Sequence, residues 1–243
     1  MSMVTDAKSA VTIAVKNSQI ELQGVLKMPA KPVGVVIFPY IACPDLIQKM
    51  SAGLRLSLEQ RQIALLTIPL YTTQEMESDK KSGFLRFNIQ LGAQRLQDIT
   101  QWLSDHPRTQ NLPVFYFAHD TAAAACVIAA VKLQNTVQAI ISIDGRLDLV
   151  KQYLPRIAAP MLLLVREQTR FLDFTQEWLR DLKIDHSLRM LPQGKPESVF
   201  QKISRNSRDW VLHFMPKYSA SLPSHIDTSV IENSTAPQEN QQV

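Results

Sequence analysis

Continuous apolar runs recur along the chain and have the character of strands buried on both faces of a parallel sheet. They cover residues 33–39, 63–69, 114–118, 139–143 and 161–165, and a weaker, edge-like run covers 186–191. Two earlier segments, 11–16 and 20–28, alternate apolar and polar residues on either side of a polar turn. This alternation predicts an antiparallel hairpin with one covered face.

Segments with helical periodicity lie between these runs. They cover residues 44–62, 89–103, 121–133, 173–183 and 197–215. Pro44 suits a first helical turn, Asn88 suits a helix N-cap, and 121–133 is small and apolar almost all round. Strands that alternate with helices imply right-handed crossovers, so we expect an α/β fold with about eight strands, mostly parallel, and helices on both faces.

The composition indicates one domain with polar ends. The chain has 243 residues, enough for one substantial core. Residues 1–9 are small and polar and are expected to be flexible, whereas 10–216 carry the strand and helix patterns. Residues 217–243 are rich in Ser, Pro, Asn and Gln without periodicity, which predicts a disordered tail.

Charge and cysteine usage narrow the expected partners. The formal net charge is +4, and the basic residues are scattered, so we expect no nucleic-acid partner. The two cysteines, Cys43 and Cys126, form no CxxC pair, which argues against a zinc site or a disulfide framework. No apolar run reaches membrane-spanning length and no G-x-G-x-x-G motif occurs. We therefore expect a cytoplasmic protein with no membrane partner, no metal and no cofactor.

Three segments have the most specific residue patterns: KSGFLRFNIQLGAQRLQDITQWL (81–103), LPVFYFAHDTAAAACVIAA (112–130) and residues 139–165. Together they resemble bacterial dienelactone-hydrolase-like proteins of the α/β-hydrolase superfamily. The first is similar to their second major helix and the stretch before it, the second to their nucleophile-elbow segment, and the third to the next two strands with a linking helix. The resemblance covers residues 10–215 and implies an α/β-hydrolase fold with its site at the carboxyl ends of the strands.

The elbow motif departs from the G-x-S-x-G pattern that acyl transfer uses. The matching residues are Ala118, His119, Asp120, Thr121 and Ala122. Asp120 thus takes the nucleophile position, and both glycines are replaced by alanine. An aspartate nucleophile would still need a histidine to activate water for the second step, so we expect Asp120 to be inactive.

The remaining machinery implied by the resemblance is also altered. The loop after the last strand, 191–197, contains no histidine, and the acid position falls on Gln168 or Thr169, with Glu167 as a shifted candidate. The first strand–helix loop, 39–43, lacks the glycines that would supply oxyanion-hole donors. Cys43 in that loop is a weaker candidate nucleophile, because no base is placed to partner it.

Polar side chains at the strand ends predict a ligand cleft instead. The candidates are Tyr40, Ile41, His119, Thr121, Asp144, Arg166, Gln168 and Lys195. The favoured interpretation is a non-catalytic α/β-hydrolase-fold protein that binds an unknown small molecule or protein partner. A hydrolase with a rearranged active site and an interaction module that uses the C-terminal tail are the alternatives, so the sequence leaves enzymatic activity and oligomeric state open.

Overall fold

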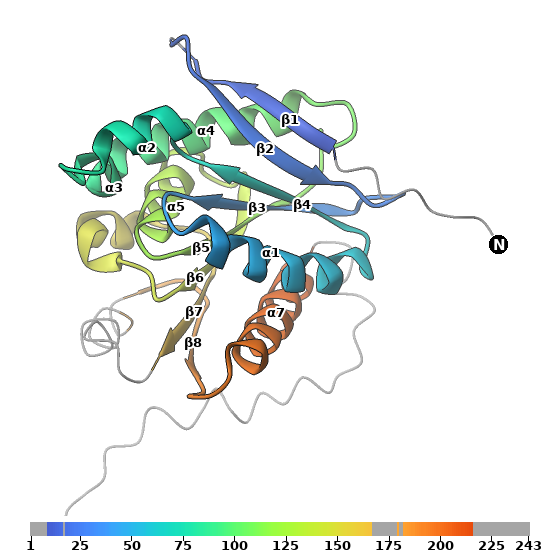
Figure 1. Cartoon of the computed structure of the whole chain (residues 1–243). Helices are drawn as coiled ribbons and strands as arrows, with labels where there is room; N and C mark the ends of the chain where they lie inside the picture. Colours follow the sequence, from blue (N-terminus) through green and yellow to red (C-terminus); the bar gives the residue numbers. More distant parts are fainter. Residues whose placement is uncertain (1–8, 17, 167–178, 180–181, 216–243) are drawn as a thin grey trace, which may run out of the picture.

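The structure is a computed structural model that describes residues 9–16, 18–166, 179 and 182–215. The helix predicted at 173–183 and the predicted polar tail fall almost wholly outside these residues, as does most of the N-terminal segment. One sheet dominates the described part (Figure 1).

The sheet has eight strands, as the apolar runs predict, in the order β1-β2-β4-β3-β5-β6-β7-β8. β1 pairs antiparallel with β2 and β2 with β4, and every other pairing is parallel. Their bounds are β1 Ser9–Ala14, β2 Glu21–Lys27, β3 Gly34–Tyr40, β4 Ile63–Pro69, β5 Val114–His119, β6 Val137–Ile143, β7 Met161–Arg166 and β8 His186–Leu191.

Helices cover both faces of this sheet (Figure 1). Their bounds are α1 Pro44–Glu59, α2 Thr73–Asp79, α3 Phe84–Phe87, α4 Ile89–Asp105, α5 Thr121–Lys132, the 3₁₀ helix η1 Leu147–Arg156 and α7 Pro196–His213. α1 and α7 pack on one face around Leu54 and Ile203, and α4, α5 and η1 enclose the core on the other face. None of the helices in the described ranges is long and apolar enough to cross a membrane.

The segment between β4 and α4 contains two short helices that the sequence pattern does not predict. Met76 is the single apolar residue of α2, so the helix has no apolar periodicity to reveal it. A capping box forms it instead: the Thr72 hydroxyl accepts from the Glu75 N–H at 3.1 Å, and Glu75 Oε2 accepts from the Thr72 N–H at 2.8 Å. α3 follows after one further turn.

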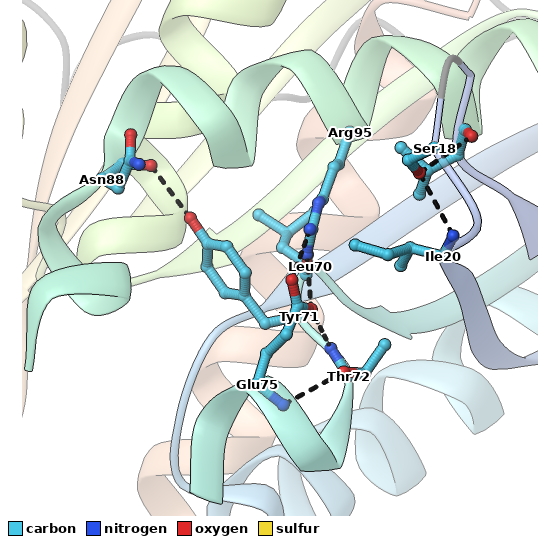
Figure 2. A network of polar contacts seen from close by, with 9 residues as sticks. Ser18, Ile20, Leu70, Tyr71, Thr72, Glu75, Asn88 and Arg95 are labelled. Atoms are coloured by element: carbon cyan, nitrogen blue, oxygen red, sulfur yellow. Dashed lines mark hydrogen bonds and ion pairs between the residues drawn. The ribbon is translucent and has the colours of Figure 1, made fainter. Parts of the chain in front are cut away.

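A buried charge network ties this segment to α4 (Figure 2). Arg95, 2% exposed, donates to both carboxylate oxygens of Glu75 at 2.6 and 2.8 Å and to the Leu70 carbonyl oxygen at 2.8 Å. Its guanidinium carbon lies 4.9 Å from the centroid of the Tyr71 ring. The Tyr71 hydroxyl donates to the Asn88 carbonyl oxygen at 2.9 Å, so the network reaches the end of α3.

Asp79 completes the anchoring of α3. Its carboxylate accepts from the Ser82 hydroxyl and, at 2.8 Å, from the Leu85 N–H in the first turn of α3. These hydrogen bonds, the Ser82 contact first, hold the pKa of Asp79 below its ordinary value despite opposition from burial. The path of residues 70–88, and hence the place of α3, is therefore held by these polar contacts together with the packing of Met76 and Leu85 against the core.

We expect Glu75→Gln to destabilise the protein by about 2–3 kcal/mol, because the buried Arg95 guanidinium loses its balancing charge. Glu59→Gln is the matched control, since Glu59 pairs with Arg55 at 2.7 Å on an exposed helix surface and is 52% exposed. Its loss should cost about 0.5 kcal/mol. Urea unfolding measures both, and equal losses would contradict the role given to Arg95.

Candidate functional site

Asp120 sits in the tight turn between β5 and α5 that the sequence predicts for it. Its φ of 55° and ψ of −131° are strained for a residue with a β-carbon. The turn is tied to the next strand: the Asp120 N–H donates to the Ile143 carbonyl oxygen at 3.1 Å, and its carbonyl oxygen accepts from the Arg146 N–H at 3.2 Å. Asp120 therefore stands at the carboxyl edge of the sheet with its side chain 26% exposed.

Arg86 of α3 contacts this carboxylate directly. Its Nη2 lies 2.6 Å from Asp120 Oδ2, in an ion pair between residues 34 positions apart. The sequence interpretation assigns Arg86 only to a family-like loop and misses this contact. The residue pattern gives no signal for it, because the pairing depends on where the unpredicted helix α3 lies.

A second arginine approaches the same corner. Arg146 forms a bidentate pair with Asp148 at 2.7 and 2.8 Å, and this pairing raises the pKa of Arg146. The guanidinium carbons of Arg86 and Arg146 each lie 5.9 Å from the centroid of the Phe87 ring. Phe87 is 53% exposed, so an aromatic ring within cation–π distance of two arginines forms part of the surface beside the elbow.

The loop after β6 supplies the next charge along the rim. Asp144 has a φ of 44° and accepts from the Arg166 N–H at 3.0 Å and from Arg166 Nε at 2.7 Å. The next residue, Gly145, has no room for a side chain, because an added Cβ would lie 2.1 Å from Ser142 Oγ. Asp144 and Arg166, two predicted cleft residues, are thus brought together as an ion pair.

His119 lies between these two pairs. Burial lowers its pKa below the ordinary value of 6.5, Asp120 and Asp144 oppose the shift, and Arg166 and Arg86 add to it. Within the described part of the chain, its imidazole makes no hydrogen bond to the Asp120 carboxylate. His119 is therefore a partly buried neighbour of the elbow whose protonation is disfavoured by burial, and no described hydrogen bond aims it at the Asp120 carboxylate.

The other described histidines lie away from the elbow. His106 ends α4 and its ring centroid is 5.0 Å from that of Trp102. His186 begins β8, at the opposite edge of the sheet, with Nδ1 2.9 Å from the Ile184 carbonyl oxygen. His213 ends α7 against Phe214. His225 lies outside the described residues.

The remaining predicted site residues have different placements. Tyr40 ends β3 and burial raises the pKa of its hydroxyl, while Ile41 and Thr121 are buried at 6% and 2% exposure. Cys43 is exposed at the N-cap of α1, and Lys195 is the N-cap of α7. Glu167 and Gln168 lie outside the described residues. Across the residues that the structure describes, no group of three or more His, Cys, Asp or Glu side chains could hold a metal ion.

A cavity opens beside this rim, between the first turns of α1 and α7. Its volume is about 760 Å³. Its walls include Leu46, Pro192, Val199 and Phe200, together with the charged side chains of Lys49 and Arg166. Arg166 thus belongs both to the ion pair with Asp144 and to the wall of this cavity.

The sheet order, the two-face helix cover and the strained turn after β5 define this chain as an α/β-hydrolase-fold protein. Among solved structures it is similar to a dienelactone hydrolase from Anabaena variabilis, with 29% identity, a TM-score of 0.78, and coverage of 86% of this chain and 98% of that one. Est1E from Butyrivibrio proteoclasticus gives a TM-score of 0.66 at 10% identity over 84% of this chain and 98% of that one. A Xanthomonas campestris α/β serine hydrolase without a lid gives 0.61 at 15% identity over 89% and 97%. The last two show likeness of fold.

Curated relatives match a smaller part of the chain. Two Mycobacterium tuberculosis proteins, each carrying the name "Putative phosphoribosyl transferase", are 34% identical over 151 residues, which is 60% of this chain. The match spans about a third of the length of those relatives, 32%. No family model matches the sequence.

The charges around His119 generate a test of this geometry. We expect Asp120→Asn to lower the pKa of His119 further, because a favourable negative charge is lost, and Arg86→Gln to raise it, because a repelling positive charge is lost. Titration of the His119 ring by NMR measures both shifts. Shifts in the same direction in the two variants would contradict the arrangement.

The lowered pKa of His119 also predicts how the stability of the wild-type protein changes with pH. The folded-state pKa of His119 lies below its unfolded value, so the unfolded chain takes up the proton first as the pH falls. We expect the His119 contribution to stability to be complete above about pH 6.5 and to decline as the pH falls from there through the folded-state pKa. Denaturant unfolding of wild type and His119→Asn across that range measures it, with a flatter profile expected for the variant.

Proposed function

We propose that this protein is a non-catalytic α/β-hydrolase-fold protein that binds a small molecule at the strand-end rim. The observation that carries the proposal is the ion pair between Arg86 and Asp120. In this pair the guanidinium of Arg86 binds the carboxylate that stands in the nucleophile position. A carboxylate oxygen whose lone pairs face a guanidinium 2.6 Å away is a weaker nucleophile than a free one, and the approach to that oxygen is filled.

The lack of a suitably placed base supports the same conclusion. Acyl-enzyme and alkyl-enzyme chemistry both need a group that activates water for the second step. His119 is partly buried beside Asp120 without a hydrogen bond to its carboxylate among the described residues, and the loop that follows β8 contains Gln193, Gly194 and Lys195. Loss of one triad member typically costs about 10⁴-fold in rate, so we expect no useful turnover from the residues on this rim.

A hydrolase with a rearranged active site is the second candidate, and the likeness to a dienelactone hydrolase along most of both chains favours it. That activity would need water to be activated by a group other than the expected histidine. The transferase name of the mycobacterial relatives belongs to proteins of which this chain matches about a third, 32%, so we do not extend that activity to this chain.

An esterase assay decides between the two candidates. We expect wild-type protein to hydrolyse p-nitrophenyl acetate and a panel of lactones no faster than Asp120→Ala, because Arg86 holds one carboxylate oxygen of Asp120 and no described residue is placed to act as a base. Turnover that Asp120→Ala abolishes would establish the rearranged hydrolase.

Two further variants separate the causes of inactivity. Asp120→Ser should stay inactive, since a serine at the elbow still lacks a base, and recovery of activity would reveal an unrecognised one. Arg86→Gln should also stay inactive. Activity gained in Arg86→Gln alone would show that the ion pair blocks an otherwise competent carboxylate.

A further inference from the structure

We propose that the cavity between α1 and α7 is a binding site for an amphipathic carboxylate, an organic monoanion with an apolar body. This inference deepens the proposed binding function and rests on it. The cavity differs from the elbow, since none of its lining residues lies between Ala118 and Ala122.

The walls of the cavity match an apolar body. Leu46 and Lys49 project from the first turns of α1, and Val199 and Phe200 come from the first turns of α7. Pro192 closes the cavity beyond the end of β8. A volume of about 760 Å³ lies within the range of small-molecule sites, which are mostly apolar with a few polar groups that fix orientation.

The charges of the walls favour an anion. Among the described lining residues the charged side chains are Lys49 and Arg166, and none is acidic. Both helices begin at this cavity, so the positive ends of their dipoles favour an anion, although Asp45 and Glu197 in their first turns offset part of this preference. A ligand with an ammonium group would be repelled by the positive charges of Lys49 and Arg166.

The number of available charges favours a monoanion. Arg166 gives Nε to Asp144 at 2.7 Å, so its charge is largely balanced. Lys49 is exposed, and it has no ion-pair partner among the residues that the structure describes. Among the described lining residues one positive charge then remains unbalanced, which matches a carboxylate better than a phosphate monoester carrying nearly two negative charges at neutral pH.

Matched eight-carbon probes test this inference by calorimetry on the full chain. Octanoate should bind saturably in a 1:1 complex, whereas octanol, octylamine and octyl phosphate should bind at least about tenfold more weakly. Acetate should show no binding, because it lacks the apolar body. Equal affinity for octanoate and octanol would overturn the assignment of the two cations, and tighter binding of octyl phosphate would overturn the choice of a carboxylate.

Variants locate the site. Lys49→Gln should weaken octanoate binding about fivefold to tenfold and leave octanol unchanged. Lys132→Gln, at the far end of α5, removes the same charge away from the cavity and should have no effect. Phe200→Ala should weaken both probes, and thermal melting confirms that each variant is folded. An unchanged octanoate affinity in both Lys49→Gln and Phe200→Ala would place the binding elsewhere and refute the proposal.

The octanoate-binding experiment and the esterase assay test this site and the proposed function separately. Lack of octanoate binding, with no Asp120-dependent esterase activity, would remove this site and leave the non-catalytic assignment standing. Octanoate binding together with Asp120-dependent turnover would keep the site and remove that assignment.

Discussion

The buried guanidinium of Arg95 is the constraint on which the arrangement of this rim depends. A charge with 2% exposure is tolerated only while Glu75 pairs with it, so α4 and the capping box before α2 are held together. Through the Tyr71 hydroxyl and the Asn88 carbonyl oxygen the same network fixes the end of α3. α3 carries Arg86 to the elbow, and the state of Asp120 is therefore set by packing that lies far from it in the sequence.

The elbow holds a strained geometry with an aspartate at its tip. A residue with a β-carbon at φ 55° and ψ −131° costs roughly 1–3 kcal/mol. The hydrogen bonds to Ile143 and Arg146 and the contact with Arg86 hold it there. In this chain the turn joins β5, the loop after β6 and α3, so Asp120 has a structural use that does not depend on catalysis.

The sequence predicts the sheet well, because strands covered on both faces have apolar runs that are easy to see, and the antiparallel hairpin has alternating ones. It predicts the elbow at Asp120 because the motif is local. It does not reveal α2, which a capping box forms, or α3, which is a four-residue turn too short to show apolar periodicity. The contact between Arg86 and Asp120 stays hidden for the same reason: it spans 34 positions and depends on the path of that unpredicted segment.

The distribution of charge along the rim separates the elbow from the cavity. At the elbow each cation has an anion within 3 Å: Arg86 pairs with Asp120, Arg146 with Asp148, and Arg166 with Asp144. A ligand that bound there would have to break an existing ion pair, which costs part of what its own contacts supply. At the cavity, Lys49 presents a charge that no described residue balances, beside apolar walls. The electrostatic arrangement therefore favours binding between α1 and α7 over chemistry at Asp120, and the arginine of β7 that lines the cavity is held in place by the carboxylate at the end of β6.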